Sequence, residues 1–237
     1  MNTPEYILLL DVETANTVDD PLVYDLGIAV TDRKGRIYEE YSFIIYDVYR
    51  CERELMQSCY YAWKIPTYER LISANESKIV QFSTARRVVR QLMKKYNITN
   101  VAAYNAYFDQ NALNTTLRYI FKSSKYNRYF FPYGTKFWCV WHMACQVICT
   151  QTTYQRWCRA HGFISPSGNV QTNAETVYAY ITQDPHFQEE HKGLDDVRIE
   201  AAIMAHCFRQ HKAMKKNIFR GCWRIPNTKS IKEKFAA

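Results

Sequence analysis

The stretch that decides the fold is Ile7–Thr14, which reads Ile-Leu-Leu-Leu-Asp-Val-Glu-Thr. Its apolar run contains neither glycine nor proline, which predicts a strand buried on both faces of a sheet. Because side chains alternate along a strand, Asp11 and Glu13 point to the same side and place two carboxylates together at the end of the strand. The strand therefore delivers a pair of acids to one edge of the core.

Two carboxylates this close repel each other unless a cation neutralises them. Hard oxygen donors on a rigid strand suit Mg²⁺ or Mn²⁺, so a divalent metal site is one interpretation of the pair. The alternative is a strand that runs out into a solvated acidic turn, which Asp19 and Asp20 would continue.

Two more strands are expected directly after this one. Residues 22–31 carry Leu26, Ile28 and Val30 on one face, and a hairpin turn at 32–35 leads into a strand from Arg36 to about Tyr46. Later in the chain, Val101–Tyr104 is a short buried strand, and the apolar segment Phe137–Cys149 reads as a short strand that turns into a helix. Strands and helices in this order, without repeats, predict one α/β domain.

Apolar residues at intervals of three and four predict the helices. We expect one from an N-cap at Ser83 to about Tyr96, one that begins near Asp109, one over 153–161 and one that Asn173 caps. A last long helix buries a stripe that includes Leu194 and Val197. The segment 49–77 gives a mixed signal, with helical pieces at 52–63 and 67–74 separated by Pro66.

Composition indicates a globular protein. The chain has 237 residues, of which 47% are hydrophobic and 15% aromatic, so it can build a sizeable core. The sequence has no run of eighteen apolar residues, which a membrane span requires, and no signal-peptide pattern at its start. We therefore expect a cytoplasmic protein. The eight cysteines contain no Cys-x-x-Cys pair, which argues against zinc and favours reduced thiols.

The positive charge is concentrated at the C-terminus. From Lys212 to Ala237 there are eight lysines and arginines against the single acid Glu233, so this segment carries +7 of the net +8. With Phe219, Trp223 and Phe235 among them, these cations could bind phosphates and stack on bases. A solvated terminus is the equally open alternative.

Three more ionisable residues follow predicted core elements. Asp109 comes directly after the strand Val101–Tyr104, at a helix start where capping would also favour an aspartate. Asp196 borders the buried stripe of the last helix and can lean toward the sheet, whereas Asp195 is turned away. His191 precedes that helix, and an exposed histidine is the alternative interpretation there.

In this order, the residues resemble the motifs of the DEDD superfamily of 3′→5′ exonucleases, specifically its DnaQ-like DEDDh branch. Asp11-Val12-Glu13 matches Asp-x-Glu after a hydrophobic strand, and Thr14 follows as is common in the family. Asn105–Asp109 matches Asn-x-x-Phe-Asp, and His191 with Asp196 matches His-x-x-x-x-Asp. Each motif is weak alone, but three in order in the expected structural context are a strong signal.

The resemblance implies an RNase H-like fold, with a mixed five-stranded sheet in which three antiparallel strands come first and helices flank the sheet. It covers residues 7 to about 208, so we expect an exonuclease domain over 1–211 and a basic C-terminal tail over 212–237. Gly193 stands where the family usually has alanine. The segment 49–77 and the aromatic loop near 126–133 have no family counterpart, and residues 173–201 also resemble exonucleases from bacteriophages.

The resemblance also implies a two-metal mechanism with two Mg²⁺ or Mn²⁺ ions. Asp11 would bridge the ions, Glu13 and Asp196 would hold the one that carries the attacking water, and Asp109 would support the other through water. His191 would take the proton, because an imidazole with a pKa near 6.5 is neutral and basic at working pH.

Thr14, Phe108 and Asn105 are expected to contact the substrate. Lys192 stands where the DEDDy branch would have tyrosine, which disfavours that branch.

The expected function is therefore metal-dependent hydrolysis of phosphodiester bonds from the 3′ ends of nucleic acid, with DNA favoured. An exoribonuclease of the same superfamily and a non-catalytic module that binds nucleic acid or a polymerase are the alternatives. The partner would be a nucleic acid with a free 3′ end and no membrane would be involved. The oligomeric state is open, with a homodimer among the alternatives.

Overall fold

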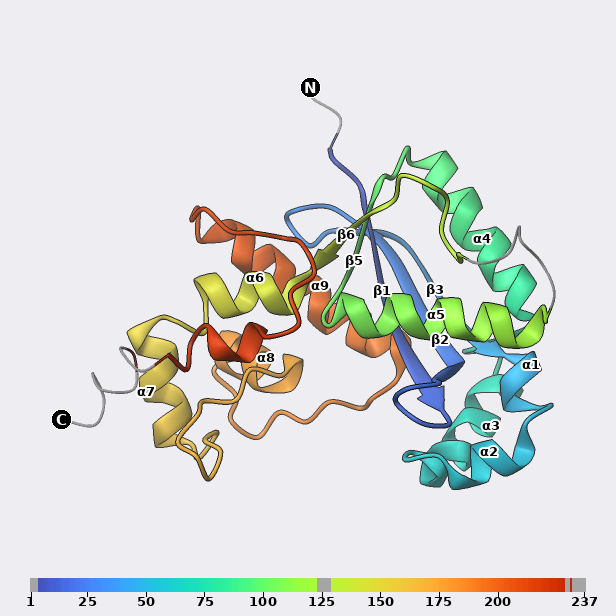
Figure 1. Ribbon diagram of the computed structural model, residues 1–237, viewed down its shortest axis with the longest axis horizontal. Coiled ribbons are helices and arrows are strands. Elements are labelled where there is room, and N and C mark those ends of the chain that lie inside the picture. The colour runs from blue at the N-terminus through green and yellow to red at the C-terminus, as the bar shows by residue number, and fades with distance from the viewer. Residues whose placement is uncertain (1–3, 123–128, 229–230, 232–237) are drawn as a thin grey trace.

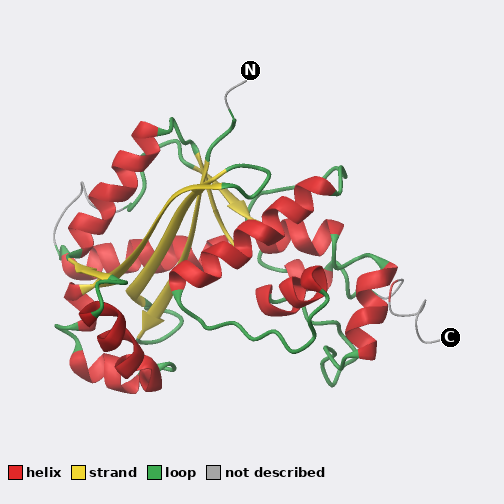
Figure 2. Ribbon diagram, turned by 180° about the vertical axis from the view of Figure 1, so that it is seen from behind, coloured by secondary structure: helices red, strands yellow, loops and turns green. Residues whose placement is uncertain are grey.

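The computed structural model describes residues 4–122, 129–228 and 231. Its strands form one six-stranded sheet in the order β4-β3-β2-β1-β5-β6, with helices on both faces (Figure 1 and Figure 2). The strands are β1 (Ile7–Ala15), β2 (Leu22–Thr31), β3 (Ile37–Ile45), β4 (Lys78–Val80), β5 (Asn100–Ala103) and β6 (Lys136–Cys139). The longest helices are α4 (Phe82–Lys95), α5 (Ala106–Ile120) and α9 (Gly193–Arg209).

The shorter helices fall into two groups. Those between β3 and β4 are α1 (Tyr46–Tyr49), α2 (Arg53–Ser58), the 3₁₀ turn η1 (Ala62–Lys64) and α3 (Ile65–Ser73). Those after β6 are α6 (Val140–Val147), α7 (Thr152–Ala160), α8 (Ala174–Thr182) and the 3₁₀ turn η2 (Cys222–Arg224). The first group lies beside the lower end of the sheet in Figure 1, and the second lies on the opposite side of the molecule.

The pairing of the strands confirms the predicted α/β class with three antiparallel strands first. Strand β2 pairs antiparallel with both β1 and β3, whereas β5 is parallel to β1 and β6 is parallel to β5. The prediction of five strands was one short, because β4 adds a sixth, parallel to β3 at the edge of the sheet. With three residues and partly exposed side chains, β4 leaves no periodic signal in the sequence.

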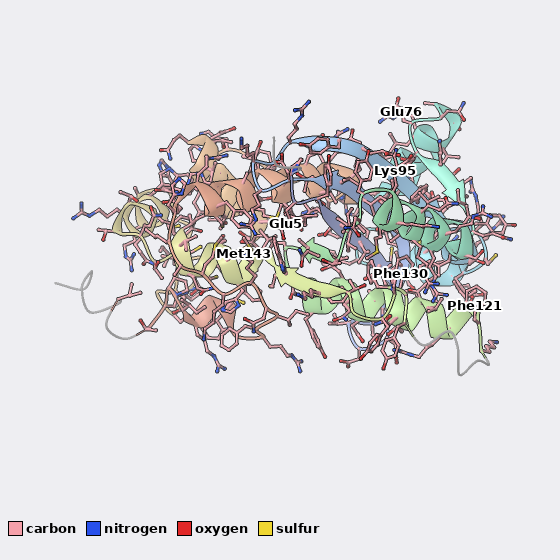
Figure 3. The ribbon with its side chains drawn as sticks, turned by 90° about the horizontal axis from the view of Figure 1, so that it is seen from above. Glu5, Glu76, Lys95, Phe121, Phe130 and Met143 are labelled. Carbon is pink, nitrogen blue, oxygen red and sulfur yellow. The ribbon has the colours of Figure 1, made fainter. Side chains whose placement is uncertain are left out.

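The core lies on both faces of the two central strands. All ten residues of β2 are buried, as are Ile7 to Leu10 of β1. Helix α9 crosses one face of these strands and α5 crosses the other, as the front and back views show (Figure 1 and Figure 2). Phe130 and Met143, which are fully buried, extend the core beyond the central strands (Figure 3). The sheet is therefore covered on both sides, as its apolar strands predict.

The start of α4 differs from the prediction. Its N-cap is Gln81 rather than Ser83, and the Gln81 side chain makes no capping hydrogen bond. Instead the carboxylate of Asp47, from α1, accepts a hydrogen bond of 2.7 Å from the Phe82 backbone N–H. A tertiary contact thus supplies the acceptor that the sequence pattern assigned to a local serine. Pro66 likewise lies within the first turn of α3 rather than between two helical pieces.

Two glycines bring the start of α9 into contact with β2. A Cβ built on Gly27 would lie 2.0 Å from the carbonyl carbon of Gly193, and a Cβ on Gly193 would lie 2.6 Å from the backbone nitrogen of Gly27. The helix therefore begins against the backbone of the sheet, at a distance that only glycine permits at both positions. The glycine at 193, unusual for the resembled family, serves this approach.

We expect Gly27→Ala to destabilise the fold by about 3 kcal/mol or more, because the added methyl group meets backbone that cannot turn aside. Urea denaturation followed by circular dichroism measures this change. Gly221→Ala is the matched control, since a Cβ there meets only side-chain atoms at 3.6 Å or beyond. Equal stability of the two variants would contradict the predicted clash.

The first part of the predicted basic tail packs against the domain. The Cys139 backbone N–H donates to the Lys216 carbonyl at 2.7 Å, and the Gln155 side-chain amide donates to the Pro226 carbonyl at 3.2 Å. Residues 229–230 and 232–237 of the tail lie outside the described residues, as do 123–128 of the aromatic loop. The eight cysteines, all described, form no disulfide. Among the described helices, none has the length and apolar character that crossing a membrane requires.

Candidate active site

Three separate segments bring the predicted catalytic residues to one cavity. Asp11 and Glu13 come from β1, Asp109 from the first turn of α5, and Asp196 from the first turn of α9, with His191 just before that helix. All five line a single cavity of about 260 Å³. Residues that are 185 positions apart in the chain thus share one site, as the motifs predict.

The β1 strand sets the positions of its two acids. Opposite β1, Asp11 pairs with Gly27 and Glu13 pairs with Asp25, and the register shifts immediately after Glu13. Both carboxylates reach the same cavity, in agreement with the alternation of a strand. Beyond the bulge, Thr14 is not among the residues that line this cavity. A bulge changes the direction of the next side chain, which explains why Thr14 is separated from the acids.

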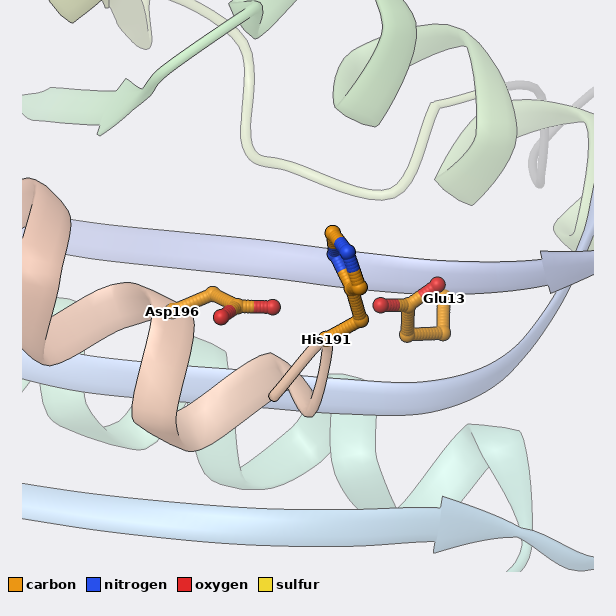
Figure 4. A group of neighbouring side chains, drawn as sticks. All are labelled: Glu13, His191 and Asp196. Atoms are coloured by element: carbon orange, nitrogen blue, oxygen red, sulfur yellow. The ribbon is translucent and has the colours of Figure 1, made fainter. Parts of the chain in front are cut away.

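Glu13, His191 and Asp196 form a close group in the cavity. One ligating atom from each of the three lies within 4.8 Å of the other two. Figure 4 shows Glu13 reaching from its strand and Asp196 from the helix end, with the His191 ring between them. The two carboxylates at this separation offer oxygen ligands that a divalent cation accepts, and the imidazole lies beside them.

Burial raises the pKa of each acid in the cavity, and repulsion between acids adds to this shift for Asp11 and Glu13. Burial raises the pKa of Asp11 well above its usual range, and the nearby charges of Glu200 and Asp109 raise it further. Burial raises the pKa of Glu13 to about 9, with Asp25 and Asp196 adding repulsion. These shifts identify a surplus of negative charge that a bound cation would relieve.

Asp109 is buried beside the backbone of β1. It is 4% exposed, and burial raises its pKa to about 8. The backbone N–H groups of Asp109 itself and of Val12 on β1 oppose this shift in pKa. The N-cap of α5 is Asn105, whose side chain makes no capping hydrogen bond, so Asp109 lies in the first turn of the helix with its carboxylate in the cavity.

A further acid, Glu200, belongs to the same cavity and was not predicted. It lies one helical turn after Asp196 on α9 and is 2% exposed. Burial raises the pKa of Glu200 well above its usual range, and the charge of Asp109 adds to this effect. The signal that could have found it is an acid four residues after Asp196, on the same apolar face of the helix.

Two buried carboxylate oxygens in the cavity have no hydrogen-bond partner. They are Oδ1 of Asp196 and Oε2 of Glu200. Buried polar atoms are nearly always paired, so an orphaned oxygen in a cluster of acids calls for an explanation. A bound cation would satisfy both oxygens, and the hard oxygen donors of this cavity suit Mg²⁺ or Mn²⁺. The residues present therefore fit the metal ions that the motifs imply.

We expect the metal-free protein to lose stability as the pH rises from about 4.5 to about 9. Folding raises the pKa of Glu13 from its ordinary value of 4.5 to about 9, and those of Asp109 and Asp196 from 3.8 to about 8. In this range the folded state binds more protons than the unfolded state, so the free energy of unfolding falls as the pH increases. The loss is complete above the highest of these pKa values.

Urea denaturation in EDTA at pH 6 and pH 9 measures this effect, which we expect to exceed about 2 kcal/mol. Adding Mg²⁺ or Mn²⁺ should restore more stability at pH 9 than at pH 6, because the ions bind ionised carboxylates. Stability that is constant or that rises over this pH range without metal would contradict the prediction.

His191 is held above the cavity by residues from the segment between β3 and β4. Its ring stacks on Tyr61 with ring centroids 5.0 Å apart and planes inclined by 24°. The Lys64 ammonium donates to the carbonyl oxygen of His191 at 2.8 Å and also to that of Glu190. Burial lowers the pKa of His191, and the positive charge of Lys64 lowers it further. The imidazole is therefore neutral at neutral pH, as a proton acceptor requires.

Sequence analysis missed several residues around the site. Asp25 is 1% exposed and accepts hydrogen bonds from the Tyr68 hydroxyl at 2.9 Å and the Gly193 N–H at 3.2 Å. Burial raises the pKa of Glu189, which also lines the cavity, to about 7. Glu189, Glu175 and His191 form a second group with ligating atoms within 4.8 Å of one another.

The predicted substrate contacts divide into two cases. Asn105 and Phe108 line the cavity, and the Asn105 carbonyl accepts a hydrogen bond of 2.8 Å from the Phe108 N–H at the start of α5. Thr14 follows the bulge of β1 and does not line it. The helix start thus brings two of the three predicted side chains to the acids.

Comparison with solved structures shows the fold. Exonuclease I from E. coli, in complex with a 5cy-dT13 oligonucleotide, matches with a TM-score of 0.51 and 15% identity over 88% of this chain and 41% of that chain. Exonuclease I from Methylocaldum szegediense matches with a TM-score of 0.52 and 17% identity over 87% of this chain and 41% of that chain. The predicted RNase H-like exonuclease fold is therefore confirmed.

The chain spans about two fifths of the length of these exonuclease I structures. No protein-family model matches the sequence, and no curated protein matches it either.

Proposed function

We propose that this chain is a metal-dependent 3′→5′ exonuclease of the DnaQ-like DEDDh type, which releases nucleoside monophosphates from the 3′ ends of nucleic acid. The proposal is supported by one observation above all: the four acids and the histidine of three separate motifs line the same cavity. The fold shared with exonuclease I is the second support. A relation to bacteriophage exonucleases, suggested by residues 173–201, belongs to the same proposal.

Asp11, Glu13, Asp109 and Asp196 would hold two Mg²⁺ or Mn²⁺ ions. The charge of Glu200 raises the pKa of Asp11, and the charge of Asp196 raises the pKa of Glu200. The oxygen of Glu200 that has no hydrogen-bond partner could therefore also bind a cation. When bound, such ions lower the pKa of water and stabilise charge on phosphoryl oxygens. The four motif acids come from β1, α5 and α9, so rigid elements fix the separation of the ligands.

His191 would accept the proton of the attacking water at a ring nitrogen. Its ring lies next to Glu13 and Asp196 and is kept in place by the stack on Tyr61. A partly exposed ring at the mouth of the cavity can pass the proton on to solvent, since 37% of the side chain remains accessible. A neutral imidazole in this position meets the geometric and the acid–base requirements of a general base.

The terminal nucleotide would enter beside α5. Phe108 and Asn105 line the cavity next to Asp109, so the ring can pack on a sugar or base and the amide can form hydrogen bonds. Thr14, at the end of β1, remains a proposed contact farther along the strand of nucleic acid. These residues would orient the 3′ end so that its phosphodiester bond meets the acids.

The basic residues 212–237 are proposed to contact phosphates outside the cavity. The Arg220 guanidinium lies 4.5 Å from the ring centroid of Tyr107, which is 42% exposed and is two residues from Asp109. Packing of the described part of this segment against the domain thus brings a cation near the entrance of the site. A strand of nucleic acid that leaves the cavity along α5 would meet this charge.

DNA is the favoured substrate. In its solved structure, exonuclease I from E. coli is bound to a thymidine oligonucleotide, and this chain shares its fold at 15% identity. A test compares 5′-labelled single-stranded DNA, duplex DNA and RNA with Mg²⁺, with Mn²⁺ and with EDTA. We expect ladders that shorten from the 3′ end, release of 5′-monophosphates, and no product in EDTA.

The outcomes separate the alternatives. Faster degradation of RNA than of DNA would favour an exoribonuclease, and binding without cleavage under any metal condition would favour a non-catalytic module. Products that shorten from the 5′ end would refute the proposed polarity.

A further inference from the structure

Lys64 is a buried cation from a segment that supplies none of the proposed catalytic residues. It ends the turn η1 between β3 and β4, in the part of the chain without a counterpart in the family motifs. The residue is only 4% exposed. Burying an ammonium group costs free energy unless its donors are satisfied, so the position needs a reason beyond filling space.

The Lys64 ammonium donates to the backbone of the loop between α8 and α9 (residues 183–192), here called the histidine loop. Its Nζ donates to the His191 carbonyl at 2.8 Å and to the Glu190 carbonyl. These are the carbonyls of the proposed general base and of the residue before it. The contact joins positions that are 127 residues apart in the sequence, so it fixes the loop from outside rather than from within.

Tyr61 holds the other end of the same histidine. Its ring stacks on the imidazole at 5.0 Å, and the Lys64 Nζ lies 4.4 Å from the centroid of the tyrosine ring. Lys64, Tyr61 and His191 therefore form a closed arrangement in which the lysine holds the backbone, the tyrosine holds the ring, and the two contact each other. A cation over an aromatic face is itself attractive, which keeps the pair together.

The histidine needs such support. His191 has a φ of +48°, in the left-handed region that costs energy for residues other than glycine. The carboxylate oxygen Oε2 of Glu189 lies 3.9 Å from Nδ1, which is too distant for a hydrogen bond. The neighbouring residue Lys192, which is the N-cap of α9, makes no side-chain capping bond.

We propose that Lys64 and Tyr61 are positioning residues that hold His191 in its reactive orientation, so the segment between β3 and β4 forms part of the active site. This inference rests on the proposed exonuclease function. Neither residue is required to touch the reacting atoms. Their contribution is to keep the ring beside Glu13 and Asp196, where a displacement of about 1 Å would slow the reaction by up to about 10²-fold.

The test is the variant Lys64→Ala, assayed on a 3′-labelled oligonucleotide with Mg²⁺. We expect kcat to fall by about 10- to 100-fold while KM changes by less than about twofold, because ring placement and not substrate binding is lost. Added propylammonium should restore part of kcat by occupying the vacated space and donating to the two carbonyls. Propanol, which has similar bulk but no charge and fewer donors, should not restore it.

Arg50→Ala is the matched control. Arg50 lies in the same segment and donates two hydrogen bonds to Glu69, at 2.6 and 2.8 Å, without contact to the histidine loop. We expect this variant to retain the kcat of the wild type. Tyr61→Leu is the second variant and replaces Lys64→Ala if that protein fails to fold. It keeps Lys64, removes the stack on the imidazole, and should lower kcat in the same manner.

The outcomes are distinct. A wild-type protein without nuclease activity would refute the proposed function itself. An active wild type with unchanged kcat in a folded Lys64→Ala variant, or in Tyr61→Leu, would overturn the positioning role. Equal rescue by propylammonium and propanol would overturn it too, since simple filling of space would then explain the loss.

Discussion

Replacement of Asp11 by asparagine is expected to lower the rate of 3′-nucleotide release by about 10³-fold or more. Asp11 lies at the centre of the acidic cavity, where the charges of Glu200, Asp109, Asp196 and Glu13 all raise its pKa. Asparagine preserves the shape of the side chain but removes one negative charge from the proposed metal ligands. Stabilisation of the transition state by bound ions is worth several kcal/mol, and each 1.36 kcal/mol is about tenfold in rate.

The same variant should be more stable than the wild type when metal is removed. Deleting one ionisable carboxylate reduces the repulsion among the buried acids, so the melting temperature in EDTA should increase. This combination of lost activity and gained stability distinguishes a ligand from a structural residue. Calorimetry with Mn²⁺ should show weaker binding.

Asp19→Asn is the matched control for Asp11→Asn. Asp19 is an exposed acid of the turn after β1 and does not line the cavity. Its replacement should leave the rate, the metal affinity and the melting temperature unchanged. Full activity of a folded Asp11→Asn variant, with Asp19→Asn as reference, would remove the basis of the metal site.

Replacement of His191 by alanine is expected to lower kcat by about 10²- to 10⁴-fold, the range for loss of a general base. Because the four motif acids remain in this variant, binding of Mn²⁺ should stay within a few-fold of the wild type. The variant thus separates proton transfer from metal binding. Single-turnover assays on a short oligonucleotide measure the chemical step directly.

His186→Ala is the control for His191→Ala. His186 is exposed, lies five residues earlier in the same loop, and does not line the cavity. It should retain full activity. A His191→Ala variant with the wild-type rate would show that another group, or solvent, accepts the proton.

Much of the site could be predicted from the sequence because its parts are local. Asp11 and Glu13 follow an apolar strand, Asp109 follows another, and Asp196 stands near the start of a helix, so spacing alone indicates where each carboxylate lies. The same holds for Asn173, whose side chain accepts a hydrogen bond of 3.0 Å from the Thr176 N–H as expected of an N-cap.

The parts that sequence analysis missed depend on contacts between distant segments. Lys64 reaches the histidine loop across 127 positions, and Asp47 replaces Ser83 as the acceptor at the start of α4 across 35 positions. Neither contact leaves a periodic pattern. The short edge strand β4 is stabilised by pairing with β3 rather than by its own three residues, so its sequence carries no signal.

The order of the site's elements along the chain has a consequence for synthesis of the protein on the ribosome. Strand β1 is made first, but helix α9, which brings Asp196 and Glu200 to it, ends only at Arg209. Every incomplete nascent chain shorter than this lacks part of the acidic cavity. The acidic cavity can therefore assemble only after α9, the helix that carries Asp196 and Glu200, has left the ribosome.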